Sequence, residues 1–195
     1  MADPVEVLDY WLGEVGADGW FAGGTALDAE ILLRFGDLWQ AARDGGLEHW
    51  VEGTVGTLAY LVLAHQLSRN MHRGRVEAFA TDPGALAAAR LALENGWDLQ
   101  APEPERMFFY LPFEHSEDPA DQVISVALMA ERLPADPELL LHARAHQMII
   151  ARFGRFPYRN AALGRTSSPE EVEFIEQGGY MTFVNALKAS HAAGA

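Results

Sequence analysis

Cysteine, lysine and long hydrophobic runs are all scarce in this sequence. Cysteine is absent from all 195 residues, which excludes disulfide bonds, thiol catalysis and thiolate metal ligands. The longest uninterrupted apolar run, at 58–64, is far shorter than the ~20 residues that a membrane-spanning helix needs. No hydrophobic stretch follows Met1, so we expect no signal peptide, no membrane partner and a cytoplasmic location.

Positive charge is also scarce, since the formal net charge is −14. This charge argues against binding to a nucleic-acid backbone, so we expect no nucleic acid among the partners. The basic residues are thirteen arginines and one lysine, Lys188. Arginine is favoured over lysine where a planar group must bind a carboxylate or a phosphate. Seven arginines are concentrated in two stretches without acidic residues, 65–75 and 152–165, namely Arg69, Arg73, Arg75, Arg152, Arg155, Arg159 and Arg165.

The local signals predict an all-α fold of about eight short helices in antiparallel pairs. Proline follows a potential helix-capping residue at Asp3-Pro4, Asp82-Pro83, Asp118-Pro119, Asp136-Pro137 and Ser168-Pro169. No segment shows the period-two alternation of a strand. We expect a single domain over 1–180 and a weakly ordered tail over 181–195. The expected helices start at Thr25 and Thr54, end at Gly96, and cover 119–132, 137–153 and 169–177, with an aromatic turn at 107–113 that Pro112 stops.

The first candidate stretch is a polar loop, 69–75, that follows an apolar helix. Its candidate ligand-binding residues are Arg69, Asn70 and Arg73. Cations at a helix C-terminus are also favoured by the helix dipole, so a purely structural role for Arg69 stays open. Three arginines, two histidines and two amides within the eleven residues 65–75 are more than that role requires.

The second candidate stretch, 113–122, places a histidine among carboxylates. Asp118 is expected to cap the next helix, with Asp121 in its first turn. Glu114 and His115 have no such structural role, and a histidine beside carboxylates is suited to proton transfer near neutral pH. We predict His115 as a catalytic residue, and Glu114, Asp118, Asp121 and Gln122 as ligand-binding residues. The alternative is a network that only fixes the loop.

The third candidate stretch, 151–160, interleaves arginine with aromatic residues. Its candidate ligand-binding residues are Arg152, Arg155, Arg159 and Asn160. In a basic protein this pattern would indicate single-stranded nucleic acid, which the net charge disfavours. The better functional interpretation is a compact anion clamp with apolar walls. In the alternative, the arginines neutralise the acidic residues of the second stretch. Those residues are Glu114, Glu117, Asp118 and Asp121.

A histidine pair, His142 and His146, stands at i and i+4 on one face of the 137–153 helix. Such a pair can bind a metal, and Glu114 or Asp118 would complete the site, but two ligands alone do not make one. We therefore predict no metal and no cofactor. His146 remains the second candidate for proton transfer.

Several blocks of the sequence resemble a known family over about residues 4–180. The blocks YLPFEHSEDPADQ at 110–122 and IIARFGRFPYRN at 149–160, followed by Leu163-Gly164-Arg165, resemble two signature blocks of the bacterial family called domain of unknown function 924. Arg69-Asn70, Arg73-Gly74 and 78–82 resemble an earlier block, and Val7–Trp11, Trp20-Phe21 and Arg34-Phe35 fit its N-terminal pattern.

The resemblance implies a fold but no activity, because the family is uncharacterised. The implied fold is a tetratricopeptide-like superhelical layer of antiparallel helix pairs. The resemblance also implies that Glu117 and most of the candidate residues above are residues typical of the family at their positions. Before the Arg-Gly pair, however, the family usually reads DQFPRN where this chain has His65-Gln66-Leu67-Ser68-Arg69-Asn70. Tyrosine is more usual at His142 and histidine at Tyr158, so we expect a ligand that differs in part from that of the relatives.

Together these patterns predict a cleft rich in arginine, histidine and aspartate that binds a small anionic ligand, either a carboxylate or a phosphate. An enzyme of this kind would use His115 or His146 as acid and base and need no cofactor. The alternative is a protein-interaction module whose concave helical groove binds a peptide through its carboxylate. A metal-assisted hydrolase built on His142 and His146 is the third hypothesis.

Overall fold

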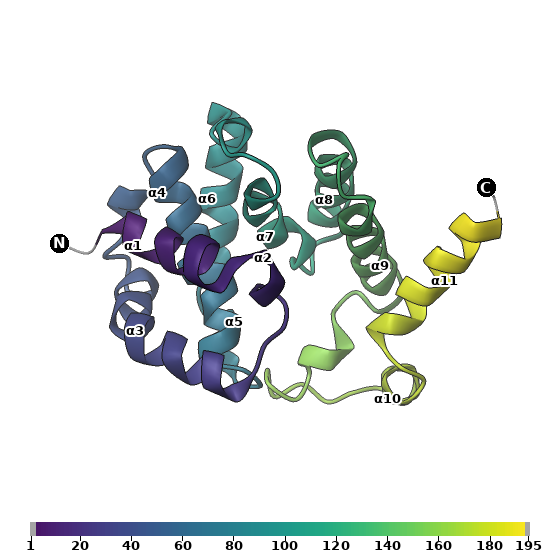
Figure 1. Ribbon diagram of the computed structural model, residues 1–195. Helices are drawn as coiled ribbons and strands as arrows, with labels where there is room; N and C mark the ends of the chain where they lie inside the picture. The colour runs from purple at the N-terminus through teal and green to yellow at the C-terminus, as the bar shows by residue number, and fades with distance from the viewer. Residues whose placement is uncertain (1–2, 194–195) are drawn as a thin grey trace. The chain divides into compact units, whose positions relative to one another are not determined.

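All regular structure in the described residues is helical, as the sequence predicts (Figure 1). The computed structural model describes the backbone of residues 3–193 and the side chains of residues 3–190. Contacts divide the chain into two compact units, one up to Pro112 and one from Phe113 onward. The expectations of one domain and of a superhelical layer concern both units together, so they stay predictions. Among the described helices, none is both long enough and apolar enough to cross a membrane.

The N-terminal unit consists of short helices, several of which are not α-helical. Its α-helices are α1 (Pro4–Leu8), α2 (Gly16–Gly19), α3 (Thr25–Arg43), α4 (Thr54–Leu61), α5 (Ser68–Met71) and α6 (Asp82–Asn95). π-helices cover Asp9–Val15 and Val62–Leu67, and 3-10 helices cover Glu48–Trp50, Val76–Phe79, Asp98–Gln100 and Glu105–Phe109. The predicted start at Thr25 and the predicted end at Gly96 are confirmed.

The core of this unit follows the helical period of α3. Ile31, Phe35 and Trp39 are each at most 2% exposed, at the spacing that the sequence shows. The buried positions of α6 are instead small, and include Ala85 and Ala89 at 0% exposure. Small side chains let α6 pack closely against α4, which lies next to it in Figure 1.

The helix predicted from Thr54 continues through the π-helix into α5, as far as Met71. A π-helical turn inserts an extra residue, and here it places His65 and Gln66 in the core, at 2% and 9% exposure. Arg69 and Asn70 therefore lie on a helix, and the polar loop that the sequence predicts begins only after α5. The local prediction fails because hydrogen bonds to distant segments, described below, satisfy these polar side chains.

Two prolines lie at helix positions that differ from the sequence prediction. Pro112 lies in the first turn of α7 (Leu111–Glu114) instead of stopping a turn, because proline there loses no hydrogen bond. The N-cap of α6 is Thr81, and Asp82 is its first residue. The Asp82 carboxylate binds Arg69 at 2.7 Å and does not cap the helix.

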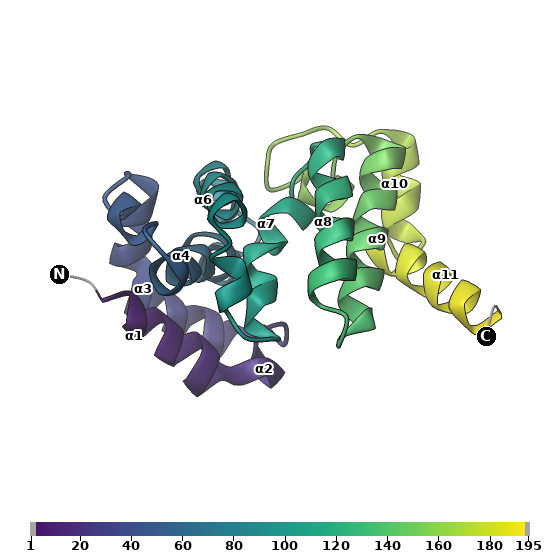
Figure 2. The same ribbon diagram turned by 90° about the horizontal axis from the view of Figure 1, so that it is seen from above.

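A helical hairpin forms the centre of the C-terminal unit. Its helices are α8 (Pro119–Arg132) and α9 (Pro137–Phe153), which lie side by side in Figures 1 and 2. Asp118 and Asp136 accept backbone N–H groups of the first turns at 2.8 and 3.0 Å. Gly154 ends α9 with a left-handed φ of 67°. Both spans agree with the sequence prediction because caps and stop signals are local.

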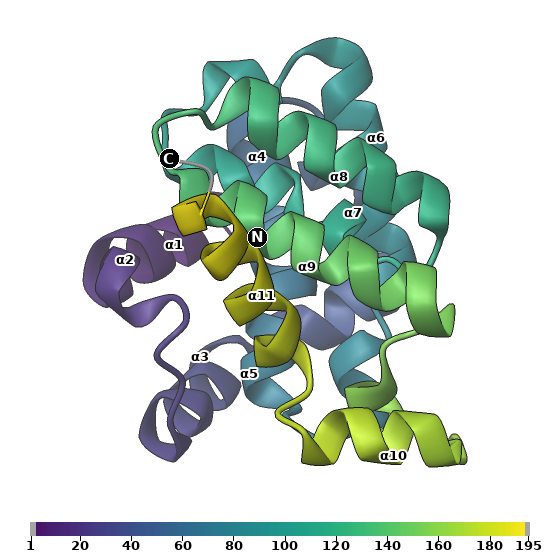
Figure 3. The ribbon, with the colours of Figure 1, turned by 90° about the vertical axis from the view of Figure 1, so that its right-hand side faces the viewer.

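Two further helices complete this unit, α10 (Pro169–Glu176) and α11 (Tyr180–Ala193), with a 3-10 helix at Pro157–Arg159. A capping box of Ser168 and Glu171 is present at the start of α10, where the sequence predicts a cap at Ser168. The described part of the tail, for which the sequence predicts weak order, is helical in α11. This helix packs along α9 (Figure 3), and Val184, 1% exposed, lies in a cluster with Leu141 and Ala145.

The N-cap of α9 gives a first testable prediction. We expect Asp136→Ala to lower the free energy of unfolding by about 1 kcal/mol, because the first turn of α9 loses its side-chain acceptor. Urea denaturation followed by circular dichroism measures this change. Glu131→Ala, at an exposed position of the same hairpin, serves as the control and should stay within about 0.5 kcal/mol of the wild type. Equal losses in both variants would contradict the capping role.

Candidate functional site

Glu114, at the end of α7, and His146, within α9, are in direct contact. The Oε1 atom of Glu114 lies 2.9 Å from Nδ1 of His146, and the two side chains are 5% and 11% exposed. The same Nδ1 lies 3.0 Å from the backbone carbonyl oxygen of His142. Because both neighbours of Nδ1 are acceptors, Nδ1 carries a proton in this arrangement.

His115 joins this pair, and we call Glu114, His115 and His146 the histidine cluster. The ring centroids of His115 and His146 are 5.3 Å apart, and the ring planes meet at 65°. One ligand atom from each of the three residues lies within 4.8 Å of the others. His115 is half-buried while its two partners are buried, so it forms the accessible edge of the cluster.

Aromatic side chains pack around His146. The ring centroids of Tyr180 and Phe156 lie 4.8 and 5.4 Å from that of His146. The hydroxyl of Tyr180 forms a hydrogen bond with Nδ1 of His142, so His142 is engaged outside the cluster. Burial raises the pKa of Tyr180, and the negative charge of Glu114 acts in the same direction. Tyr180 therefore keeps its proton at neutral pH.

Gln122 fixes the loop that carries Glu114 and His115. Its side chain is fully buried, and Nε2 donates to three backbone carbonyl groups within 113–116, at 3.3, 2.6 and 2.7 Å. Asp121 accepts a hydroxyl hydrogen bond from the same loop at 2.8 Å. Gln122 and Asp121 therefore fix the backbone that positions Glu114 and His115 in the cluster.

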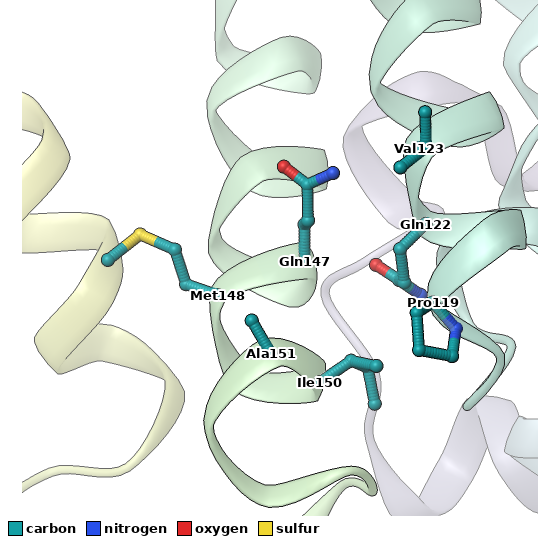
Figure 4. Close-up of a pocket in the computed structure, with 7 residues that line it drawn as sticks. All are labelled: Pro119, Gln122, Val123, Gln147, Met148, Ile150 and Ala151. Carbon is teal, nitrogen blue, oxygen red and sulfur yellow. The ribbon is translucent and has the colours of Figure 1, made fainter.

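A shallow apolar hollow lies between α8 and α9 (Figure 4). Its volume is about 310 Å³, and its lining residues are Pro119, Gln122, Val123, Gln147, Met148, Ile150 and Ala151. None of these belongs to the histidine cluster, so hollow and cluster are separate features. Gln122 contributes to both, since it lines the hollow and holds the loop of the cluster.

Arg155 is bound to a buried carboxylate. Its Nε and Nη2 atoms donate to the two oxygens of Glu171 at 2.6 and 2.8 Å. Glu171 is 3% exposed, and it also accepts from Asn160 at 3.3 Å and from the Ser168 backbone N–H at 2.7 Å. These bonds, above all the one from Arg155, lower the pKa of Glu171 to about 2. Arg155→Ala is therefore expected to lower the stability of the protein, whether or not Arg155 binds a ligand.

Arg165 and Arg159 lie near another carboxylate, that of Glu117. Arg165 Nη1 donates to Glu117 at 2.9 Å, and so does the Phe156 backbone N–H. Burial alone would raise the pKa of Glu117, but these bonds and the charges of Arg165 and Arg159 lower it overall. The Arg159 guanidinium lies 4.4 Å from the Phe156 ring centroid, and its residue is 8% exposed. Arg159 is thus the buried cation next to the ring that contacts His146.

Two of the arginines, Arg152 and Arg155, have partners other than those named from the sequence. Glu117, an acidic residue of the second stretch, does pair with an arginine, Arg165. Arg152 pairs instead with Glu170 at 2.9 Å, on the surface. Asp118 serves as the predicted N-cap. These pairs tie the chain between α9 and α10 together, which is the structural alternative considered for this stretch.

The earlier arginine stretch forms its own network within the N-terminal unit. Arg73 donates to both oxygens of Asp28, at 2.8 and 3.0 Å, and Asn70 donates to Asp28 at 2.9 Å. The hydrogen bond from Arg73 is the main cause that lowers the pKa of Asp28. Arg69 binds Asp82 at 2.7 Å. The three candidate residues of this stretch thus each bind a carboxylate of their own unit.

Sequence reasoning missed two residues that shape the site, Tyr180 and Glu171. Tyr180 lies just before a segment rich in alanine, in which the helical spacing of the larger apolar residues is hard to recognise. That spacing was available as a signal, since the apolar residues of α11 fall at i, i+3, i+4 and i+7, namely Tyr180, Phe183, Val184 and Leu187. Glu171 completes the capping box of α10, but no local signal shows that its carboxylate also binds an arginine sixteen residues away.

Comparison with known proteins decides the family. The model of a family described as "Bacterial protein of unknown function (DUF924)" matches residues 7–179. The chain belongs to this family. A solved structure, that of the protein of unknown function ATU0120 from Agrobacterium tumefaciens, is 39% identical, with a TM-score of 0.83, over 89% of this chain and 97% of that one. No functionally curated protein matches. Membership in the DUF924 family therefore supplies a fold and no activity.

The departures from the DUF924 pattern near residue 65 lie in the core. His65 is 2% exposed, and Leu67 and Ser68 are fully buried. The Ser68 hydroxyl donates to the Ala78 carbonyl at 3.0 Å. These side chains are used in packing the N-terminal unit, and the histidine cluster belongs to the other unit.

Proposed function

We propose that this protein binds a small anionic molecule, a carboxylate or a phosphate ester, at the histidine cluster, and exchanges a proton with it through Nε2 of His146. The observation that carries this proposal is the contact between Glu114 and Nδ1 of His146. A carboxylate that holds Nδ1 fixes both the tautomer and the ring orientation, which is how a histidine is prepared for acid–base work. We propose the cytoplasm as the compartment.

The charges around the cluster support an anionic ligand of small size. Arg155 and Arg165 are occupied by Glu171 and Glu117, so they are poor candidates for a clamp. Arg159 is the buried cation beside Phe156, and Phe156 contacts His146. Arg159 together with a protonated His146 would offer positive charge to one carboxylate or one phosphate group.

The experiment is a thermal-shift screen of chelator-treated protein against small carboxylates and phosphates. A ligand at a hundred times its dissociation constant stabilises by about 2.7 kcal/mol, or roughly 5–10 °C for a chain of this length. We expect one class of anion to produce such a shift in the wild type and in His49→Gln, whose histidine is exposed in the N-terminal unit. The shift should vanish in His146→Gln.

The shift on adding ligand is compared within each variant, so a lower starting melting temperature of His146→Gln does not confuse the result. A shift that persists in His146→Gln would place the ligand elsewhere. Absence of any shift in the wild type would leave the arginines as a purely structural network and would overturn the proposal.

A further inference from the structure

The histidine cluster combines one carboxylate and two imidazoles in a place where Glu114 and His146 are buried. Burial raises the pKa of the neighbouring Tyr180, and the negative charge of Glu114 acts in the same direction. Carboxylate oxygens and imidazole nitrogens are common ligands of divalent transition metals, so this group of side chains is suited to a cation.

The atoms of the cluster are arranged as metal ligands would be. Glu114, His115 and His146 each offer one ligand atom, and these atoms lie within 4.8 Å of one another. Ligand atoms about 2.1 Å from a tetrahedral zinc ion are roughly 3.4 Å apart, so the three side chains have to close in around an ion, and Glu114 has to turn away from Nδ1 of His146. Glu114 comes from the end of α7, His115 from the loop that follows it, and His146 from α9. His115 lies at the accessible edge of the cluster, and the other two residues are buried.

The hydrogen bonds of His146 also fit a metal ligand. Its Nδ1 has two acceptors, Glu114 Oε1 at 2.9 Å and the His142 carbonyl oxygen at 3.0 Å. If Glu114 turns toward an ion, the His142 carbonyl still holds the Nδ1 proton. Nε2 then remains the ligand atom in a fixed orientation, which is the outer-shell support that metal-binding histidines usually have.

We infer that Glu114, His115 and His146 bind one divalent transition-metal ion, with zinc as the best match. Two histidines and one glutamate form a known catalytic zinc set that leaves a fourth position open. A divalent ion and its glutamate ligand together carry a charge of +1, which a single anion neutralises. The inference deepens the proposed function, because the anion would then reach Nε2 of His146 through the ion, which takes the place of the proton.

This site differs from the histidine pair that the sequence offers. The pair His142 and His146 shares a helix face, but the ring of His142 binds Tyr180 and its carbonyl supports His146. His142→Gln keeps that carbonyl and should keep metal binding. His115→Gln, at the half-buried position, removes a ligand with the least disturbance of packing and should lose it.

The test is a titration of chelator-treated full-length protein with Co²⁺, followed by displacement with Zn²⁺, with no anion added. We expect one Co²⁺ per chain, with visible absorption bands of a tetrahedral site that Zn²⁺ abolishes. Since loss of an outer-shell partner weakens metal binding by about 10–100-fold, His115→Gln and His146→Gln should weaken it by at least about 100-fold. His142→Gln and His49→Gln should bind as the wild type does, and circular dichroism checks that each variant is folded.

The outcomes separate this inference from the proposed function. Metal uptake that survives His115→Gln but is lost in His142→Gln would assign the ion to the helix pair and overturn the inference. Absence of Co²⁺ and Zn²⁺ uptake, with the anion shift of the chelator-treated protein intact, would also overturn it and leave the proposed function standing. Uptake of one ion at the cluster supports the metal site, and absence of an anion shift in both the chelator-treated and the zinc-loaded protein removes the proposed anion.

Discussion

Glu171→Gln is expected to lower the free energy of unfolding by about 3 kcal/mol at neutral pH. The side chain is 3% exposed and accepts hydrogen bonds from Arg155, Asn160 and the Ser168 backbone N–H. Glutamine removes the charge that pairs with Arg155 and replaces one accepting oxygen by a donor, so that donors face one another. Breaking a buried pair by changing one partner typically costs 3–5 kcal/mol, and the partial exposure of Arg155 reduces this. Urea denaturation measures the loss.

The same variant should show a characteristic dependence on pH. The pKa of Glu171 is lowered from 4.5 to about 2 in the folded protein, so its contribution to stability is complete above pH 4.5 and is lost as the pH falls toward 2. The difference between wild type and Glu171→Gln should therefore shrink across this window. Glu170→Gln is the control, because its exposed pair with Arg152 should contribute less than about 1 kcal/mol. A difference that stays constant down to pH 2 would contradict the assignment.

Gly56→Ala should destabilise the N-terminal unit by about 3 kcal/mol. A Cβ atom at this position would lie 2.2 Å from the backbone oxygen of Trp50, a distance that real Cβ atoms do not reach. Trp50 is 4% exposed and its backbone oxygen cannot rotate away, so the first turn of α4 must move. Overpacking of this kind costs 1–3 kcal/mol or more. Thermal unfolding followed by circular dichroism measures the effect.

Gly13→Ala is the matched control for this substitution. Gly13 lies in a helical segment, and a Cβ atom there would meet nothing within 4 Å. Alanine should be neutral or stabilise by up to about 1 kcal/mol, because it restricts the unfolded chain more than glycine does. A large loss in Gly13→Ala as well would mean that the close approach to Trp50 is not the cause.

The parts of the fold that the sequence predicts well are those with local causes. The spans of α8 and α9 agree with prediction because Asp118, Asp136 and Gly154 mark their ends by capping and by a left-handed residue. The π-helix at Val62–Leu67 has no such local mark. It depends on packing within the N-terminal unit, so the position of Arg69 and Asn70 on a helix could not be read from the polar sequence around them.

The sequence predicts which residues form the candidate site, but it predicts only some of the residues that they bind. The sequence singled out Glu114, His115 and His146, and the structure places these three together. The arginines were singled out as well, but Glu171, which binds Arg155, lies sixteen residues away, and Asp28, which binds Arg73, lies 45 residues away. Pairing over such separations is decided by tertiary structure, for which a single sequence contains no local signal.

The family match ends at residue 179, and α11 begins at Tyr180. The match therefore stops one residue before the helix that supplies a ring next to His146. Glu114, His115 and His146 all lie within the matched residues, and Tyr180, which packs against His146, lies outside them. A substitution at Tyr180 changes the shape and polarity around His146 while Glu114 and His115 stay the same. Under the proposed function, we expect such a substitution to change ligand preference without changing the residue that exchanges the proton.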